Sequence, residues 1–260
     1  MGRFSSLELE ETQQSESQNE GKDIFSSERQ NAETILKKAI ENFQRCDFEQ
    51  SMKFFARVLS FDNGNAFAWM GQIKCLINLH ELKEAIMWTD KAVEIIGENA
   101  NFLAAKSCAY CRMGDFSKAY AYSDASLEQK GASSYVWLCR GEVLLQQKRK
   151  NYDFCFDKAI SAQSESWDIL VEVARIYMFY NKNAIALTYL EKAKEKNPTE
   201  SLIWYELGNC YINMGVKGKA IKSLSHALEL NPEMEMANIL VKKAESSGFF
   251  SRILKRYFRE

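Results

Sequence analysis

The residues of this chain that could carry chemistry are few and scattered. Cys108 and Cys111 form one Cys-x-x-Cys pair, a spacing used for zinc binding and for thiol redox chemistry. A zinc site needs about four ligands, and the sequence has no second pair of this kind. The only histidines, His80 and His226, lie far from this pair in the sequence. We therefore interpret Cys108 and Cys111 as small side chains packed in a helix and expect no metal site.

Other catalytic signatures are missing from the sequence. The phosphate-binding glycine loops GxxxxGK(S/T) and GxGxxG do not occur, and neither do the GxSxG and HExxH motifs. The closely spaced carboxylates Glu8, Glu10 and Glu11 belong to a polar N-terminal segment. Two histidines in 260 residues leave little for general acid–base catalysis. We predict that the protein is not an enzyme and needs no cofactor.

Composition restricts the fold class, the partners and the compartment. The 34 Lys and Arg residues nearly balance the 35 Asp and Glu residues, so no nucleic-acid partner is expected. The short basic cluster of Lys148, Arg149 and Lys150 is interpreted as a solvated turn. Only 2 Pro and 12 Gly occur, too few for the turns of an all-β fold, which favours helices. The 7 cysteines are odd in number and, apart from Cys108 and Cys111, show no paired spacing, so we expect a reducing, cytoplasmic compartment.

A repeat of 34 residues organises the middle of the chain. In the last copy, large residues occupy Trp204, Leu207, Tyr211 and Leu224, small residues occupy Gly208, Ala220 and Ala227, and a proline follows at Pro232. The same positions 34 residues earlier hold Leu170, Val173, Ala174, Tyr177, Ala186, Leu190, Ala193 and Pro198. The pattern continues upstream through Trp137, Leu103, Trp69 and Ile35, with one residue missing from a turn of the fourth unit. The six predicted units cover residues 32–65, 66–99, 100–133, 134–166, 167–200 and 201–234.

This pattern resembles the tetratricopeptide repeat, a pair of antiparallel helices, across about 203 of the 260 positions. The unit at 201–234 matches nearly every signature position, whereas the unit at 134–166 matches least because KRKNY replaces the usual turn. One pair of helices cannot cover its own apolar face, so each unit packs on the next. The resemblance implies an all-α, right-handed superhelical solenoid with a C-terminal capping helix.

The repeat assigns packing roles to particular residues. Small side chains such as Gly208 and Ala220 let neighbouring helices approach closely, and prolines end the second helices. Trp69, Trp137 and Trp204 are predicted to lie in the core and not to contact a ligand.

The two ends of the chain differ from its body. Residues 1–31 carry seven acids and three bases and are rich in Ser, Gln and Asn, so a disordered acidic tail is predicted. Ser27 and Gln30 could form a capping box for a first helix that ends near Arg45. A capping helix is expected at 235–247, with Met236, Leu240 and Ala244 at helical spacing.

A basic amphipathic helix is predicted at residues 248–260, which carry four bases and one acid. Its apolar stripe consists of Phe249, Phe250, Ile253, Leu254, Tyr257 and Phe258. Three roles remain open for this stripe: packing on the capping helix, docking a partner, or lying on an anionic membrane surface.

The first helices of the units should line a concave groove that is apolar for a water-facing surface. An exposed apolar strip of this kind is typical of a partner-binding site. The residues predicted to line it are Phe67, Met70, Lys74, Arg112, Tyr135, Leu138, Glu142, Val171, Arg175, Met178, Tyr205 and Asn209.

We interpret the chain as an adaptor or scaffold whose groove binds an extended or helical segment of a protein partner. Chaperone adaptors of the family hold a C-terminal carboxylate with Lys and Asn at set groove positions. Here those positions hold Leu36, Ile40, Met70, Lys74, Ala104 and Cys108, so an Hsp70/Hsp90 tail clamp is not expected. Two alternatives stay open: a self-assembling scaffold, and an adaptor attached peripherally to the inner face of a membrane by residues 248–260.

Overall fold

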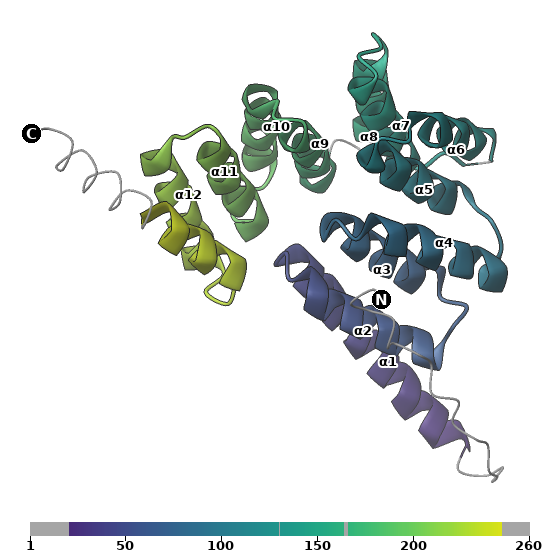
Figure 1. The fold of residues 1–260 in the computed structure, drawn as a ribbon. Coiled ribbons are helices and arrows are strands. Elements are labelled where there is room, and N and C mark those ends of the chain that lie inside the picture. The colour runs from purple at the N-terminus through teal and green to yellow at the C-terminus, as the bar shows by residue number, and fades with distance from the viewer. Residues whose placement is uncertain (1–20, 130, 164–165, 246–260) are drawn as a thin grey trace, which may run out of the picture. The chain divides into compact units, whose positions relative to one another are not determined.

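The computed structural model describes residues 21–129, 131–163 and 166–245, and side chains from residue 32 onward (Figure 1). Within these ranges the chain forms helices and no strand, so the predicted all-α class is confirmed. The chain divides into two compact units, unit 1 (Met1–Ser126) and unit 2 (Leu127–Glu260).

Each unit is built from helix pairs. Those of unit 1 are α1 (Gly21–Gln44) with α2 (Phe48–Phe61), α3 (Ala66–Asn78) with α4 (Leu82–Ile96), and α5 (Ala100–Met113) with α6 (Phe116–Glu128), which runs across the unit boundary. Those of unit 2 are α7 (Ser134–Gln146) with α8 (Tyr152–Ala162), α9 (Trp167–Phe179) with α10 (Asn183–Lys196), and α11 (Ser201–Asn213) with α12 (Lys217–Leu230).

The same turn joins the two helices of every pair. One or two positions after the end of each first helix lies a residue with a positive φ: Cys46, His80, Gly114, Lys148, Asn181 and Gly215. In the last pair, Gly215 N–H donates to Ile212 O and Val216 N–H donates to Tyr211 O, both at 2.9 Å. This Schellman cap satisfies carbonyls at the helix end, and equivalent bonds occur in the other five pairs.

The turn residues locate the irregularity of the fourth unit. Successive positive-φ residues lie 34 positions apart, except Lys148 and Asn181, which lie 33 apart. In addition, α8 begins four residues after Lys148, whereas α12 begins two residues after Gly215. Helix α8 therefore lacks most of a first turn and is 11 residues long, against 14 for α10 and α12.

Small residues bring the helices of a pair together. A Cβ atom on Gly208 of α11 would lie 2.5 Å from Leu224 Cγ on α12. A Cβ atom on Gly141 of α7 would likewise lie 2.5 Å from the Phe156 ring on α8. Ala220, which faces Gly208, is fully buried. These contacts explain why the repeat keeps small residues at such positions.

Aromatic side chains fill the remaining space. In unit 2 the ring of Phe156 lies 5.3 Å from that of Tyr177, which stacks on Tyr189 at 5.6 Å. Trp69 is buried in unit 1, while Trp137 and Trp204 are half-buried against the core of unit 2. Trp204 therefore keeps part of its ring accessible.

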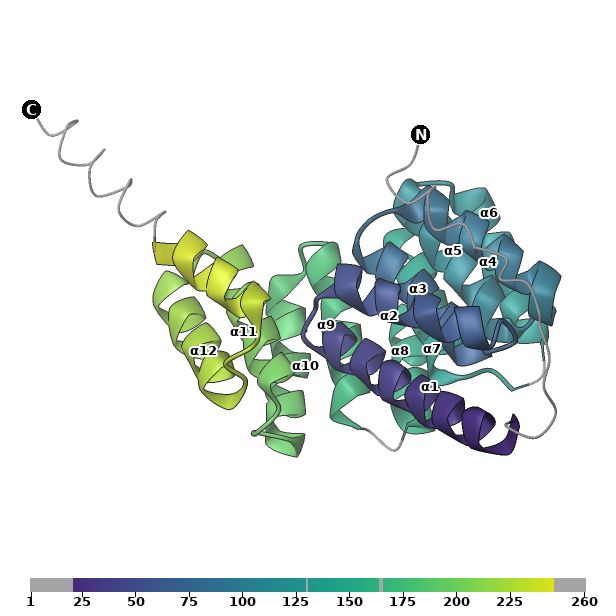
Figure 2. The same cartoon turned by 90° about the horizontal axis from the view of Figure 1, so that it is seen from below.

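Both chain ends differ in detail from the sequence-based expectation. Residues 21–31, predicted to belong to the disordered tail, are helical, because no Pro or Gly interrupts the helix that packs through Ile35 and Ala39. The terminal helix covers 235–245 among the described residues (Figure 2). It buries Ala237 and Ala244, with Met234 just before it, whereas Met236 and Leu240 are only half-buried. Residues 1–20 lie outside the described part.

We expect Gly208→Val to lower the free energy of unfolding by about 1–3 kcal/mol, because the added atoms overlap Leu224. Gly218→Ala is the control: it adds a methyl group on α12 with no atom within 4 Å, and should be neutral or stabilise by up to about 1 kcal/mol. Urea denaturation followed by circular dichroism measures both variants. Equal midpoints for Gly208→Val and the parent would contradict the packing described for α11 and α12.

Candidate protein-binding surfaces

The predicted groove residues of unit 1 remain accessible to a partner. Phe67, in the first turn of α3, is 57% exposed, and its ring lies 6.3 Å from Phe55 of α2. Met70 and Lys74 lie on the same helix, three and seven residues after Phe67, and both are half-buried. Arg112 on α5 is half-buried as well. The Asn65 side chain accepts a hydrogen bond from Ala68 N at 3.0 Å and so fixes the helix start that carries Phe67.

Most of the predicted groove residues of unit 2 are instead buried. Leu138, Glu142, Val171, Met178 and Tyr205 are each less than a tenth exposed. Helix α9 contacts both α7 and α11, so side chains directed at the neighbouring first helices are covered by them. The expectation of an exposed apolar strip is therefore wrong for these five positions; Tyr135 and Asn209 are half-buried.

Polar groove positions in unit 2 link neighbouring first helices. Arg175 Nε on α9 lies 2.6 Å from Glu206 Oε1 on α11, with side-chain exposures of 14% and 4%. Arg175 Nη1 also lies 3.0 Å from Glu172 Oε1, so the guanidinium serves two carboxylates. The Tyr180 hydroxyl donates to Glu142 Oε1 at 3.1 Å. Such bonds orient the first helices and leave Arg175 and Glu142 little capacity for a ligand.

Cys108 and Cys111 are buried and not joined in a disulfide bond, and the same holds for the other five cysteines. The described residues contain no group of three or more His, Cys, Asp or Glu side chains placed to hold a metal ion. Burial raises the pKa of the Cys75 thiol to about 12 and that of Cys210 to about 11, where the Glu206 carboxylate adds to the effect. These thiols are protonated at neutral pH, and the protonated form is a poor nucleophile.

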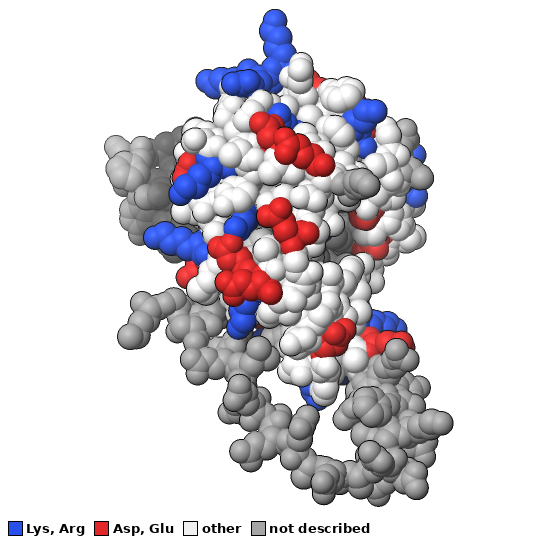
Figure 3. All heavy atoms as spheres, turned by 90° about the vertical axis from the view of Figure 1, so that its right-hand side faces the viewer, with Lys and Arg blue, Asp and Glu red and all other residues white. Residues whose placement is uncertain are grey.

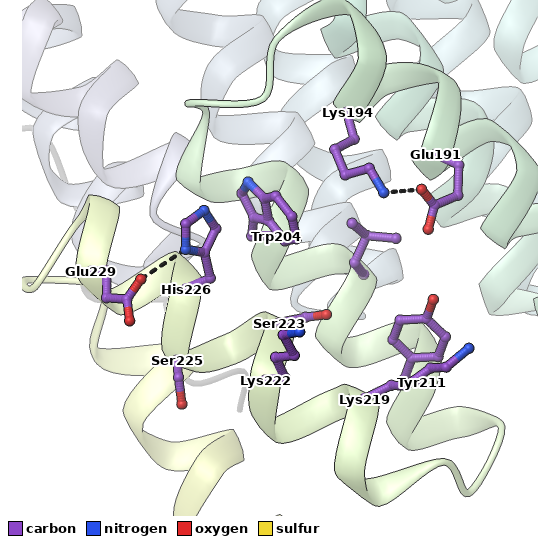
Figure 4. A pocket seen from close by; sticks show the side chains of 11 residues that line it. Glu191, Lys194, Trp204, Tyr211, Lys219, Lys222, Ser223, Ser225, His226 and Glu229 are labelled. Atoms are coloured by element: carbon purple, nitrogen blue, oxygen red, sulfur yellow. Dashed lines mark hydrogen bonds and ion pairs between the residues drawn. The ribbon is translucent and has the colours of Figure 1, made fainter.

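An aromatic pocket of about 540 Å³ lies between α10, α11 and α12 (Figure 4). Trp204 and Tyr211 from α11 form its floor, and Leu207 lies between them in the sequence. The His226 ring of α12 meets Trp204 edge-on at 4.4 Å, and its Nδ1 lies 2.8 Å from Glu229 Oε2. Because the floor consists of aromatic rings, it suits an apolar group of a ligand or partner.

Lysines surround this floor. Lys194 of α10 lies 5.6 Å from the centre of the Trp204 ring and pairs with Glu191, while Lys219 of α12 lies 5.4 Å from the Tyr211 ring. Burial, with the Glu191 carboxylate, raises the pKa of Tyr211. Sequence reasoning missed this pocket because its α12 wall consists of residues outside the repeat signature.

No helix between residues 21 and 245 combines the length and apolarity required to span a bilayer. The apolar stripe from Phe249 to Phe258 lies outside the described residues, and its three alternative roles stay predictions.

We expect Arg175→Met to lower stability by about 3–5 kcal/mol, because the buried Glu206 carboxylate loses its partner. The double variant Arg175→Met/Glu206→Leu should recover most of this loss, since the uncompensated charge is gone. Denaturation of the four members of this mutant cycle measures the coupling. Additive effects would contradict a cross-helix ion pair.

We expect an alkylating reagent to leave the cysteines of the folded protein unmodified. At pH 8, iodoacetamide is expected to add to none of the buried thiols in the folded chain and to all 7 after unfolding in guanidinium. Intact mass spectrometry counts the adducts, and rapid native labelling of Cys108 or Cys111 would contradict their structural role.

Residues 202–234 match the family model described as tetratricopeptide repeat. The bovine BBSome complex member BBS4 is 25% identical over 183 residues, which cover 69% of this chain and 35% of that protein. Anaphase-promoting complex subunit 7 of Dictyostelium discoideum is 22% identical over 227 residues, covering 86% of this chain and 38% of the relative. This chain thus spans little more than a third of the length of either relative.

Among solved structures, a thermophilic tetratricopeptide-repeat protein of Thermus thermophilus superposes with a TM-score of 0.47 at 15% identity. The match covers 82% of this chain and 98% of that protein.

Proposed function

Because this chain is a tetratricopeptide-repeat protein, we propose that it is a non-enzymatic adaptor that binds a segment of a partner protein. The binding face is formed by the first helices of unit 1. Phe67 supplies the apolar anchor, while Met70 extends the apolar surface, and Lys74 and Arg112 orient the bound segment.

The exposure of Phe67 is the observation that carries this proposal. A phenylalanine more than half exposed on a helix costs solvation free energy that burial against a partner would recover. Its position in the first turn of α3 is fixed by the Asn65 cap, so little rotational freedom of the backbone is lost on binding.

The surface charge favours a protein over a nucleic acid as partner. Figure 3 shows one face on which basic and acidic side chains are interspersed with a larger uncharged area. Together with a net charge of −1, such a surface gives little attraction to a phosphate backbone.

The names of the two sequence relatives support an assembly as the setting. Both are described as members of multi-subunit complexes, the BBSome and the anaphase-promoting complex. We therefore propose that the partner of this chain is a subunit of a larger protein assembly, with the aromatic pocket of unit 2 as a further contact.

Phe67→Ala is expected to weaken partner binding about tenfold or more, because anchor residues carry most of the binding energy. Its stability should stay within about 0.5 kcal/mol of the parent, since the side chain is exposed. Affinity capture with mass spectrometry identifies the partner, and calorimetry then measures the affinity of each variant.

Met87→Ala is the matched control, because Met87 is 58% exposed on α4, a second helix of the same unit. It should bind like the parent. Equal binding by Phe67→Ala and the parent, or equal losses in both variants, would refute the assignment of the binding face.

A further inference from the structure

Two neighbouring turns of unit 2 gather three lysines around one cavity. Lys148 and Lys150 come from the turn between α7 and α8, and Lys182 comes from the turn between α9 and α10. The cavity they line has a volume of about 590 Å³, and Tyr152 and Tyr180 form part of its wall. Lys148 and Lys150, which the sequence predicts as part of a solvated turn, lie beside Lys182 only in the folded chain.

The positive charge of this basic turn pocket is not compensated within the described residues. Lys148, Lys150 and Lys182 are exposed, and none of them forms an ion pair with any residue that the structure describes. The one carboxylate in the lining, Asp153, accepts a hydrogen bond from the Tyr177 hydroxyl at 3.2 Å. Three bases against one acid leave the lining with a net charge of +2.

One of these lysines, Lys182, also stands where the fold itself favours acids. In unit 1 the residue after each positive-φ position is acidic: Asp47, Glu81 and Asp115. Acids suit this place because a second helix begins there and its N-terminus attracts negative charge. In unit 2 the equivalent residues are Arg149, Lys182 and Val216. Lys182 is the N-cap residue of α10, whereas Arg149 lies three residues before α8 and does not line the cavity. A base at the N-cap of α10 opposes this preference, which indicates a role for Lys182 other than helix stability.

We propose that the basic turn pocket binds a carboxylate-rich segment of the partner protein. The cavity is larger than a single carboxylate group, and its tyrosine walls suit the apolar stems of Glu side chains, so several residues of one segment can enter it. This inference rests on the proposed adaptor function, because the basic turn pocket supplies an additional contact for the same partner.

The test is calorimetric titration of the full chain with two capped ten-residue peptides, one alternating Glu and Ala and one alternating Gln and Ala. The Glu peptide should bind about tenfold more tightly or better, and added salt should weaken it. Lys182→Asp should abolish Glu-peptide binding, yet raise the melting temperature by about 2–4 °C, because it restores an acidic helix start. A loss of binding together with a gain in stability cannot result from misfolding.

Lys217→Asp is the matched control, since Lys217 is exposed at the start of α12 and does not line this cavity. It should keep the affinity of the parent for the Glu peptide. Equal affinity for the two peptides, or equal losses in Lys182→Asp and Lys217→Asp, would overturn the inference.

The outcome is separable from that of the proposed function. If Phe67→Ala weakens partner capture but the Glu peptide does not bind, only the basic turn pocket is refuted. If Lys182→Asp removes Glu-peptide binding but Phe67→Ala captures the partner normally, the acidic-segment site stands and the unit 1 binding face is refuted.

Discussion

The whole architecture depends on one constraint: a pair of helices cannot bury its own apolar face and must be covered by its neighbour. Close approach within each pair satisfies part of this need, as at Gly208, where a single added carbon would overlap Leu224. The Schellman turns then repeat because each pair must reverse direction in the same way. Even the fourth pair, which is one residue short, keeps this turn and gives up the first turn of α8 instead.

The same constraint decides which side chains remain for binding. In unit 2, α9 packs on α7 and α11, so Met178 and Tyr205 are buried and Arg175 is held by Glu206. In unit 1, α3 likewise contacts α1 and α5, but Phe67 in its first turn stays exposed, and Met70 and Lys74 stay half-buried. A buried arginine pair contributes mainly to the arrangement of the helices, whereas an exposed phenylalanine is available to a partner.

Local signals in the sequence were enough to predict the helical class, since periodic apolar residues and prolines such as Pro198 act within one unit. The burial of Leu138 or Tyr205 was not predictable, because it depends on how closely neighbouring first helices pack. The basic turn pocket was equally hidden, since Lys148 and Lys182 meet only when two turns adjoin in space. The extension of α1 to Gly21 shows that a polar composition alone does not prevent a helix from continuing.

The central claim, that the first helices of unit 1 contact a partner segment, is tested most directly by photo-crosslinking. Benzoylphenylalanine at position 67 should form a covalent adduct with one discrete partner protein, and the adduct should be absent when the same group replaces Met87. Capture of that partner without a crosslink at position 67, or with equal crosslinking at both positions, would contradict the account.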